Sequence, residues 1–307
     1  MEGNRVYEDG TVTGKIIKGI GGFYYVAAED GKVYECKARG AFRKEKLRPL
    51  VGDDCELSVL DAEACLGSVD RILARRNELI RPAVANTDQA IVIFAASKPE
   101  PGERLIDRYL VGMSYVDMPV ILVINKVDAE RKRAEELREL YEQAGYRVLL
   151  TSAKTGEGVD GLSSLLEGKT SVLSGPSGVG KSSLMNAVFP GFEAKTGSIS
   201  EKIGRGRHTT RHSELIRVAK ATYLCDTPGF SSVELPERMT EETLELCFPE
   251  FSEYLGTCRF GTSCRHMAEP DCSVKRAVEE GHIKKSRYES YLGLQEILRS
   301  RRKSEWN

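Results

Sequence analysis

The chain has 307 residues, 40% apolar and 30% charged, and its 45 Lys+Arg against 46 Asp+Glu leave a net charge of −1. This composition is globular and excludes disordered and fibrous chains, and the length predicts about two domains with room for a small third. The longest apolar run, residues 118–124, is far below the roughly 18 residues that span a bilayer, and the first residues do not form a secretory signal. We therefore expect a cytoplasmic protein that does not bind membranes.

The first segment, residues 1–73, alternates short β-type runs with glycines. The runs cover residues 11–17, 23–27, 32–36 and 54–59. Short strands separated by glycine turns at this density predict a small β-barrel. A five-stranded barrel of the oligonucleotide-binding (OB) type is favoured at this length, although an SH3-like barrel has much the same pattern.

The second segment, residues 74–232, changes to apolar strands followed by helical stretches. A helical periodicity covers residues 134–144. The candidate buried strands are residues 90–95, 120–124, 148–150, 171–173 and 222–225. Alternating strands and helices predict a mostly parallel α/β sheet.

The third segment, residues 233–307, is predicted to be helical. Thr240 is expected to cap a helix whose first turn holds Glu241 and Glu242. A cysteine cluster follows, and then an amphipathic helix closes the chain. The apolar face of that helix is predicted to carry Tyr288, Tyr291, Leu292, Ile297 and Leu298.

Positive charge is gathered in three runs, one in each segment. Residues 37–48 contain six Lys/Arg and one acid, residues 202–211 contain four and no acid, and residues 275–307 contain nine against five Glu. One such run alone is most simply a solvated face. Three of them favour an extended polyanion such as RNA as a partner.

Residues 125–128, NKVD, and residues 151–154, TSAK, each follow a predicted strand. The carboxylate of Asp128 accepts both N1–H and the N2 amino protons of guanine, whereas adenine presents an unprotonated N1. The backbone N–H of Ala153 would then meet guanine O6. NKVD alone is equally explained by a strand-end turn, but its pairing with TSAK favours a guanine site. The predicted base-site residues are Asn125, Lys126, Val127, Asp128, Ser152, Ala153 and Lys154.

Residues 175–182, GPSGVGKS, fit the pattern G-x-x-x-x-G-K-[ST] between an apolar strand and a helical stretch. Glycines let backbone N–H groups converge on phosphate, Lys181 supplies charge at the β- and γ-phosphates, and Ser182 offers a hydroxyl to Mg²⁺. An accidental glycine-rich turn is the alternative, which the strand–loop–helix context disfavours. The predicted phosphate-site residues are Gly175, Pro176, Ser177, Gly178, Val179, Gly180, Lys181, Ser182 and Ser183.

Two further motifs follow this loop. In DTPG, residues 226–229, Asp226 is expected to hold Mg²⁺ through water, and Gly229 to bring its N–H close to the γ-phosphate. Upstream, in a loop rich in glycine and arginine, either Thr209 or Thr210 is expected to complete the Mg²⁺ shell when the triphosphate orders the loop. With Thr210 in that role, the predicted Mg²⁺ ligands are Ser182, Thr210 and Asp226.

The residue after DTPG is Phe230, which cannot orient an attacking water as the glutamine of many GTPases does. His208 is the candidate for this role because a neutral imidazole accepts a hydrogen bond from water. Packing or an RNA contact is the alternative for His208. The predicted catalytic residues are therefore His208, Lys181 and Thr210.

The motif order is a circular permutation, because NKVD and TSAK precede GPSGVGKS and DTPG instead of following them. This ordered set, with the barrel and the cysteine cluster, resembles the circularly permuted, small-subunit-dependent GTPases of bacteria (the RsgA, or YjeQ, group) over essentially the whole chain. The resemblance implies an OB-type RNA-binding barrel (1–73), a GTPase domain (74–232) and a helical zinc domain (233–307). It also implies binding to the 30S ribosomal subunit and its 16S rRNA in late assembly, with GTP hydrolysis there. We expect a monomer.

The cysteine cluster reads Cys258-x₅-Cys264-x-His266-x₅-Cys272. Three thiolates and one imidazole form the closed tetrahedral shell of a structural Zn²⁺, and eight cysteines in this length are too few for a disulfide scaffold. Buried free cysteines are the alternative. The first gap is one residue longer than the four usual in the resembled family, which leaves Cys247 as a substitute for Cys258.

These features predict an Mg²⁺-dependent GTPase that uses GTP and GDP as a switch and a zinc-stabilised tail to engage ribosomal RNA. A nucleotide-gated RNA-binding module, in which hydrolysis is incidental, is the alternative from another class. A P-loop kinase or ATPase is disfavoured by NKVD. GTP turnover with and without small subunits discriminates between the first two.

Overall fold

The computed structural model describes residues 11–38, 48–79, 83–100, 102–190, 214–226 and 235–305. These residues form two compact units. The first unit contains the described residues of 11–89, 164–173 and 189–226, and the second contains those of 90–163, 174–188 and 235–305. No helix in the described ranges is both long and apolar enough to cross a membrane.

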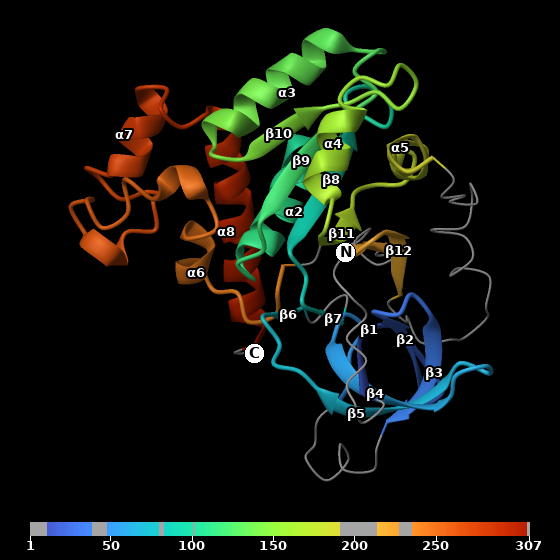
Figure 1. Cartoon of the computed structure of the whole chain (residues 1–307). Helices are drawn as coiled ribbons and strands as arrows, with labels where there is room; N and C mark the ends of the chain where they lie inside the picture. The colour runs from blue at the N-terminus through green and yellow to red at the C-terminus, as the bar shows by residue number, and fades with distance from the viewer. Residues whose placement is uncertain are drawn as a thin grey trace. The chain divides into compact units, whose positions relative to one another are not determined.

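Five strands of the first unit close into a barrel (Figure 1). They are β1 (Thr11–Ile20), β2 (Phe23–Ala28), β3 (Val33–Ala38), β4 (Asp54–Asp61) and β5 (Leu66–Ile72). They pair in the order β1-β2-β3-β5-β4, and the barrel closes between β4 and β1. All pairs are antiparallel except β3–β5, which is parallel. This connectivity is that of an OB-type barrel, so the favoured prediction is confirmed.

The barrel core is built from alternate residues of its strands. Val26, Cys36, Leu57 and Val69 are fully buried. Strand β5 has no counterpart among the predicted runs because Gly67 takes one of its inward positions. A Cβ at Gly67 would lie 3.0 Å from the Cys36 sulfur, so the packing that selects glycine also removes the apolar signal.

A six-stranded sheet has the order β10-β9-β8-β11-β13-β12. Its strands are β8 (Gln89–Ala95), β9 (Val120–Asn125), β10 (Arg147–Leu150), β11 (Thr170–Ser174), β12 (Leu215–Ala219) and β13 (Thr222–Asp226). The pairs β10–β9, β9–β8 and β11–β13 are parallel, which confirms the predicted mostly parallel sheet. Strand β12 runs antiparallel to β13 and was missed by the pattern, because only Leu215 of its five residues is buried. A separate two-stranded ribbon pairs β6 (Glu78–Leu79) with β7 (Val84–Ala85).

Four helices follow strands of this sheet. They are α2 (Glu103–Ser114), α3 (Arg131–Gln143), α4 (Val159–Leu166) and α5 (Lys181–Val188). Helix α3 packs along β9 and β10 in Figure 1 and buries Ala134, Leu137 and Tyr141. The loops that carry NKVD, TSAK and GPSGVGKS each lie where a parallel strand ends, which is the usual position of ligand sites in such sheets.

The C-terminal part of the second unit is helical, as predicted. Its elements are α6 (Glu241–Glu245), η1 (Pro249–Phe251), η2 (Gly261–Ser263), α7 (Ser273–Glu279) and α8 (Lys285–Glu305). Thr240 caps α6 as predicted, and it forms a capping box with Thr243. The Thr240 hydroxyl accepts from the Thr243 N–H at 3.3 Å. The Thr243 hydroxyl accepts from the Thr240 N–H at 2.9 Å.

The buried face of α8 differs by one position from the prediction. Tyr291, Leu294 and Leu298 are buried, whereas Ile297 is 38% exposed. Residues three and seven positions after Tyr291 return to its face of the helix, but the residue six positions on does not. The core therefore takes Leu294 in place of Ile297.

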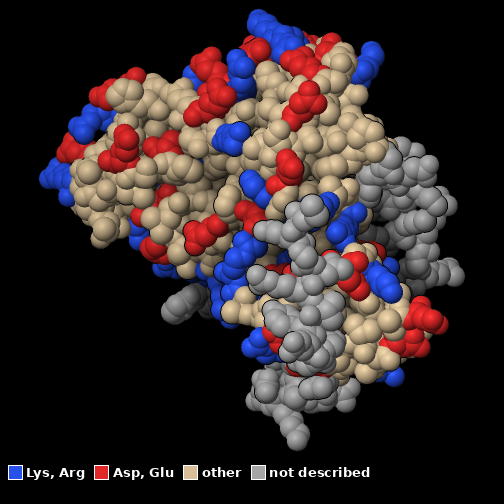
Figure 2. Space-filling model, viewed as in Figure 1, with Lys and Arg blue, Asp and Glu red and all other residues tan. Residues whose placement is uncertain are grey.

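Positive and negative side chains are interspersed on the face shown in Figure 2. Of the basic runs, residues 202–211 and most of 37–48 lie outside the described residues. In the third run several basic side chains are paired: Arg287 with Asp107 and Glu250, and Arg299 and Arg302 with Glu241. This run is therefore not simply a free basic face.

Candidate nucleotide site and metal centre

Three loops of the second unit meet around the side chain of Asn125, which is 1% exposed at the end of β9. Its Nδ2 donates to the carbonyl of Val179 at 2.9 Å. Its Oδ1 accepts from the Thr151 hydroxyl at 3.2 Å and from the Ala153 N–H at 3.4 Å. One side chain thus joins NKVD to both TSAK and GPSGVGKS.

Lys126 makes a second connection between NKVD and GPSGVGKS. Its Nζ donates to the carbonyls of Gly178 and Lys98, each at 2.6 Å. Its backbone is left-handed, with φ of 61°, a conformation that non-glycine residues adopt at functional sites when the surrounding structure enforces it. The contact with Lys98 was not predicted, because a backbone carbonyl has no sequence signature.

Asp128 is held by TSAK. Its Oδ1 accepts from the Ser152 hydroxyl at 2.6 Å, and its Oδ2 lies 3.9 Å from Nζ of the exposed Lys154. An ionised carboxylate has about four acceptor positions, so the short bond from Ser152 orients the group and leaves acceptor capacity for a ligand. Asp128 itself is 22% exposed at the side chain.

Two glycines of GPSGVGKS are required by close approaches. Gly175 has φ of 136°, and a Cβ there would lie 2.0 Å from the Ile93 carbonyl oxygen. Gly180 has φ of 94°, and a Cβ there would lie 2.6 Å from Asn125 Nδ2. The loop curls around Lys181, whose Nζ donates to the carbonyls of Gly175 and Pro176 at 2.8 Å each. Helix α5 begins at Lys181, and its N-terminal N–H groups and dipole favour an anion.

The other predicted nucleotide residues are placed as follows. Ser182 is half-buried and Ser183 is exposed in the first turn of α5. The backbone of Asp226 ends β13, and its side chain is outside the described part of the chain. His208, Thr209, Thr210 and Gly229 lie wholly outside the described residues.

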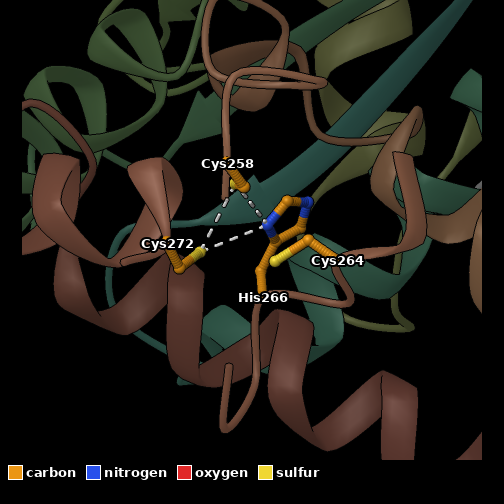
Figure 3. A group of neighbouring side chains, drawn as sticks. All are labelled: Cys258, Cys264, His266 and Cys272. Carbon is orange, nitrogen blue, oxygen red and sulfur yellow. Dashed lines mark hydrogen bonds between the residues drawn. The ribbon is translucent and has the colours of Figure 1, made fainter. Parts of the chain in front are cut away.

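The four predicted metal ligands are brought together in the second unit (Figure 3). Their ligand atoms all lie within 4.8 Å of one another, and all four residues are buried. The Cys258 and Cys272 sulfurs are 3.8 Å apart, and His266 Nδ1 lies 3.6 Å from the first and 3.3 Å from the second. Zn–S bonds of about 2.3 Å place two tetrahedral thiolates about 3.8 Å apart, so the residues fit zinc. The cluster could therefore hold a metal ion.

The longer first gap does not displace Cys258. The short helix η2 occupies three of the five residues between Cys258 and Cys264 and turns the chain back toward the cluster. The Cys247 sulfur instead donates to the Thr243 carbonyl at 3.4 Å, and Cys247 is not in the cluster. The substitution of Cys247 for Cys258 is therefore wrong.

Burial shifts the pKa values of Cys264 and His266 in the cluster. It raises the pKa of the Cys264 thiol to about 12, and it lowers the pKa of His266, which keeps the imidazole neutral. A neutral imidazole is the form that binds metal. Because thiolates are the metal-binding form of cysteine, metal uptake here would release protons.

The family comparison covers the barrel and the nucleotide site. The RsgA GTPase family matches residues 72–236, and the RsgA N-terminal domain matches residues 13–66. The chain belongs to the RsgA GTPase family. Among its relatives, the small ribosomal subunit biogenesis GTPase RsgA of Agathobacter rectalis is 52% identical over 95% of this chain and 100% of that protein. The protein of the same name from Caldanaerobacter subterraneus is 46% identical over 95% and 97%.

Two solved structures align with nearly the whole length of this RsgA-family chain. YjeQ from Thermotoga maritima has a TM-score of 0.80 at 35% identity, covering 94% of this chain and 98% of that one. YloQ, described as a circularly permuted GTPase, has a TM-score of 0.78 at 35% identity, covering 98% and 99%. The predicted circular permutation is thus confirmed, and this member of the RsgA family is a GTPase.

Proposed function

We propose that this GTPase couples its nucleotide state to association with, and release from, the small ribosomal subunit in late assembly. The name shared by its relatives, small ribosomal subunit biogenesis GTPase, supports the partner. The single observation that carries a guanine-nucleotide switch is the Asn125 network, which joins the base motifs to the phosphate loop in one hydrogen-bonded unit.

The base is recognised by NKVD and TSAK. Asp128 accepts from N1–H and the N2 amino group of guanine, and the Ala153 N–H donates to O6. Ser152 keeps the Asp128 carboxylate oriented, as its 2.6 Å bond supports. Lys126 and Lys154 flank the base, and Val127 joins Lys126 to Asp128 in the loop that follows β9.

The phosphates are held by residues 175–183. Backbone N–H groups of this loop and the ammonium of Lys181 face the β- and γ-phosphates, and Ser182, Thr210 and Asp226 hold Mg²⁺. Mg²⁺, when bound, neutralises charge on the phosphate oxygens. Gly229 brings its N–H to the γ-phosphate, Thr209 is the alternative to Thr210 at Mg²⁺, and His208 orients the attacking water.

The C-terminal cluster of Cys258, Cys264, His266 and Cys272 holds one structural Zn²⁺, which the 3.8 Å separation of two sulfurs supports. We divide the chain into a barrel (1–73), a GTPase domain (74–232) and a zinc domain (233–307). The barrel and the zinc domain bind 16S rRNA of the 30S subunit. Because ribosomal subunits are assembled in the cytoplasm, the monomeric protein acts there.

The test is GTP turnover by the full chain alone, with purified 30S subunits, and with 50S subunits as the control. We expect 30S subunits to raise kcat by roughly tenfold or more and 50S subunits to leave it unchanged. Subunit affinity is measured in parallel with GDP and a non-hydrolysable GTP analogue. Nucleotide-dependent affinity without stimulated turnover would favour the nucleotide-gated RNA-binding module. The absence of both effects would overturn the proposal.

A further inference from the structure

We propose that Glu245 is the positioning residue of the metal centre: its carboxylate accepts a hydrogen bond from Nε2–H of His266 and so holds Nδ1 toward the cysteine sulfurs. This inference rests on the metal site of the proposed function. It assigns a role to a residue outside the Cys258–Cys272 motif, at the C-terminal end of α6.

The two ring nitrogens of His266 face different partners. Nδ1 lies 3.3 Å from the Cys272 sulfur and 3.6 Å from the Cys258 sulfur, which makes it the ligand atom. Nε2, on the other side of the ring, lies 3.4 Å from Glu245 Oε2. A metal on Nδ1 leaves the proton of the neutral imidazole on Nε2, where it needs an acceptor.

Water does not supply that acceptor. His266 is 1% exposed, and its ring lies among those of Phe251 and Tyr291, with centroids 6.1 and 6.3 Å away. His266 Nε2 and Glu245 Oε2 are both buried, and neither atom has a hydrogen-bond partner among the described residues. A buried donor and a buried acceptor without other hydrogen-bond partners face each other, and a small rotation of the carboxylate joins them.

The position of Glu245 is fixed independently of the metal. It is the last residue of α6, and α6 is anchored by the Thr240 cap, by buried Leu244 and by the bond from Gln295 Nε2 to the Glu241 carbonyl at 3.0 Å. Its side chain is 12% exposed, and Arg265 Nη1 lies 3.8 Å from Oε2 and balances the charge.

The backbone of His266 is held by other groups, and packing against the rings of Phe251 and Tyr291 does not distinguish Nδ1 from Nε2. The Tyr288 hydroxyl donates to the His266 carbonyl at 2.6 Å, and the His266 backbone is left-handed, with φ of 56°. Neither this hydrogen bond nor the backbone conformation determines which ring nitrogen faces the cysteine sulfurs. A hydrogen bond to Glu245 would do so, because it would select which nitrogen faces the sulfurs.

Glu242 offers a matched control. It lies on the same helix and also pairs with Arg265, at 2.9 Å, but it is 55% exposed at the side chain and does not contact His266 in the described structure. Removal of Glu242 therefore perturbs α6 and Arg265 without removing the acceptor for Nε2.

The experiment measures metal affinity of the full chain by competition with a chromophoric chelator, using Zn²⁺, and records the ligand-field spectrum after Co²⁺ substitution. We expect Glu245→Ala to weaken Zn²⁺ binding about 10–100-fold and to alter the Co²⁺ spectrum. Glu245→Gln keeps an acceptor oxygen and is expected to lose less. Glu242→Ala is expected to match the parent in both readouts.

The outcomes separate this inference from the metal site itself. A parent protein that binds no Zn²⁺ would overturn the proposed metal site, and the inference with it. A parent that binds Zn²⁺ while Glu245→Ala and Glu245→Gln bind as tightly would overturn only the role of Glu245. Equal losses in Glu245→Ala and Glu242→Ala, with an unchanged Co²⁺ spectrum, would assign Glu245 a merely structural role and also overturn it. If Glu245→Ala does not fold, Glu245→Gln decides by the same two readouts.

Discussion

Arg287 Nη1 donates to Asp107 Oδ1 at 2.6 Å across 180 residues of sequence, and both side chains are 1% exposed. The bond joins α8 to α2. Arg287 also bonds Glu250 through Nε at 2.6 Å and lies over the Phe248 ring, 4.7 Å from its centroid. Burial alone would lower the pKa of Arg287, but the charges of Asp107 and Glu250 outweigh it and raise that pKa well above its usual value. A fully buried cation thus connects the C-terminal helix to a helix of the GTPase domain.

Asp107→Ala is expected to destabilise the protein by about 3–5 kcal/mol, because removal of one partner leaves part of the charge of Arg287 buried and unbalanced. Urea denaturation followed by far-UV circular dichroism measures the effect. Lys284→Ala breaks an exposed pair with Glu139, and it should lower stability by less than about 1 kcal/mol. Equal losses in the two variants would contradict a special role for the buried pair.

Asp128→Asn is expected to lower GTP affinity roughly 10–100-fold, because hydrogen bonds to a charged acceptor are lost. Preference should shift toward xanthine nucleotides, since the amide donates to the carbonyl that replaces the guanine amino group. Titration with fluorescent GTP and XTP analogues measures both effects in one variant. Unchanged GTP affinity would remove Asp128 from the base site.

Cys264→Ser and His266→Ala are each expected to lose stoichiometric zinc and to destabilise the region after residue 233, because a structural metal contributes folding free energy directly. GTP binding should be retained. Cys247→Ser is the control, since that thiol is buried but bonds Thr243 outside the cluster. Elemental analysis that finds full zinc content in both ligand variants would refute the assignment.

His208→Ala is expected to leave binding of a GTP analogue and of 30S subunits nearly unchanged and to lower subunit-stimulated kcat by roughly tenfold or more. The reason is that Phe230 occupies the position from which glutamine orients water in many GTPases. His212→Ala, in the same segment, is the control. If stimulated kcat is equal in His208→Ala and the parent, backbone groups or rRNA orient the water instead.

Features that depend on neighbouring residues were predictable from the sequence. Strand patterns and glycine turns indicated the barrel and the parallel sheet, and the order of NKVD, TSAK and GPSGVGKS indicated the permutation. The four residues of the candidate metal cluster lie within fifteen residues of sequence, so their spacing alone predicted that they come together. Periodicity was less exact at single positions, as the exchange of Ile297 for Leu294 on α8 shows.

Features that depend on a distant partner required the tertiary structure. The carbonyl of Lys98 that receives Lys126 has no side-chain signature, and Glu245 is one of many glutamates until it is found 3.4 Å from His266 Nε2. Nothing in the sequence distinguishes Asp107 and Arg287 from the many charged side chains that lie on the surface. Local patterns encode which face of an element is buried, but they do not encode which residue of another element it meets. The folded chain alone turns these isolated charges into a buried ion pair and Glu245 into a candidate support for the metal centre.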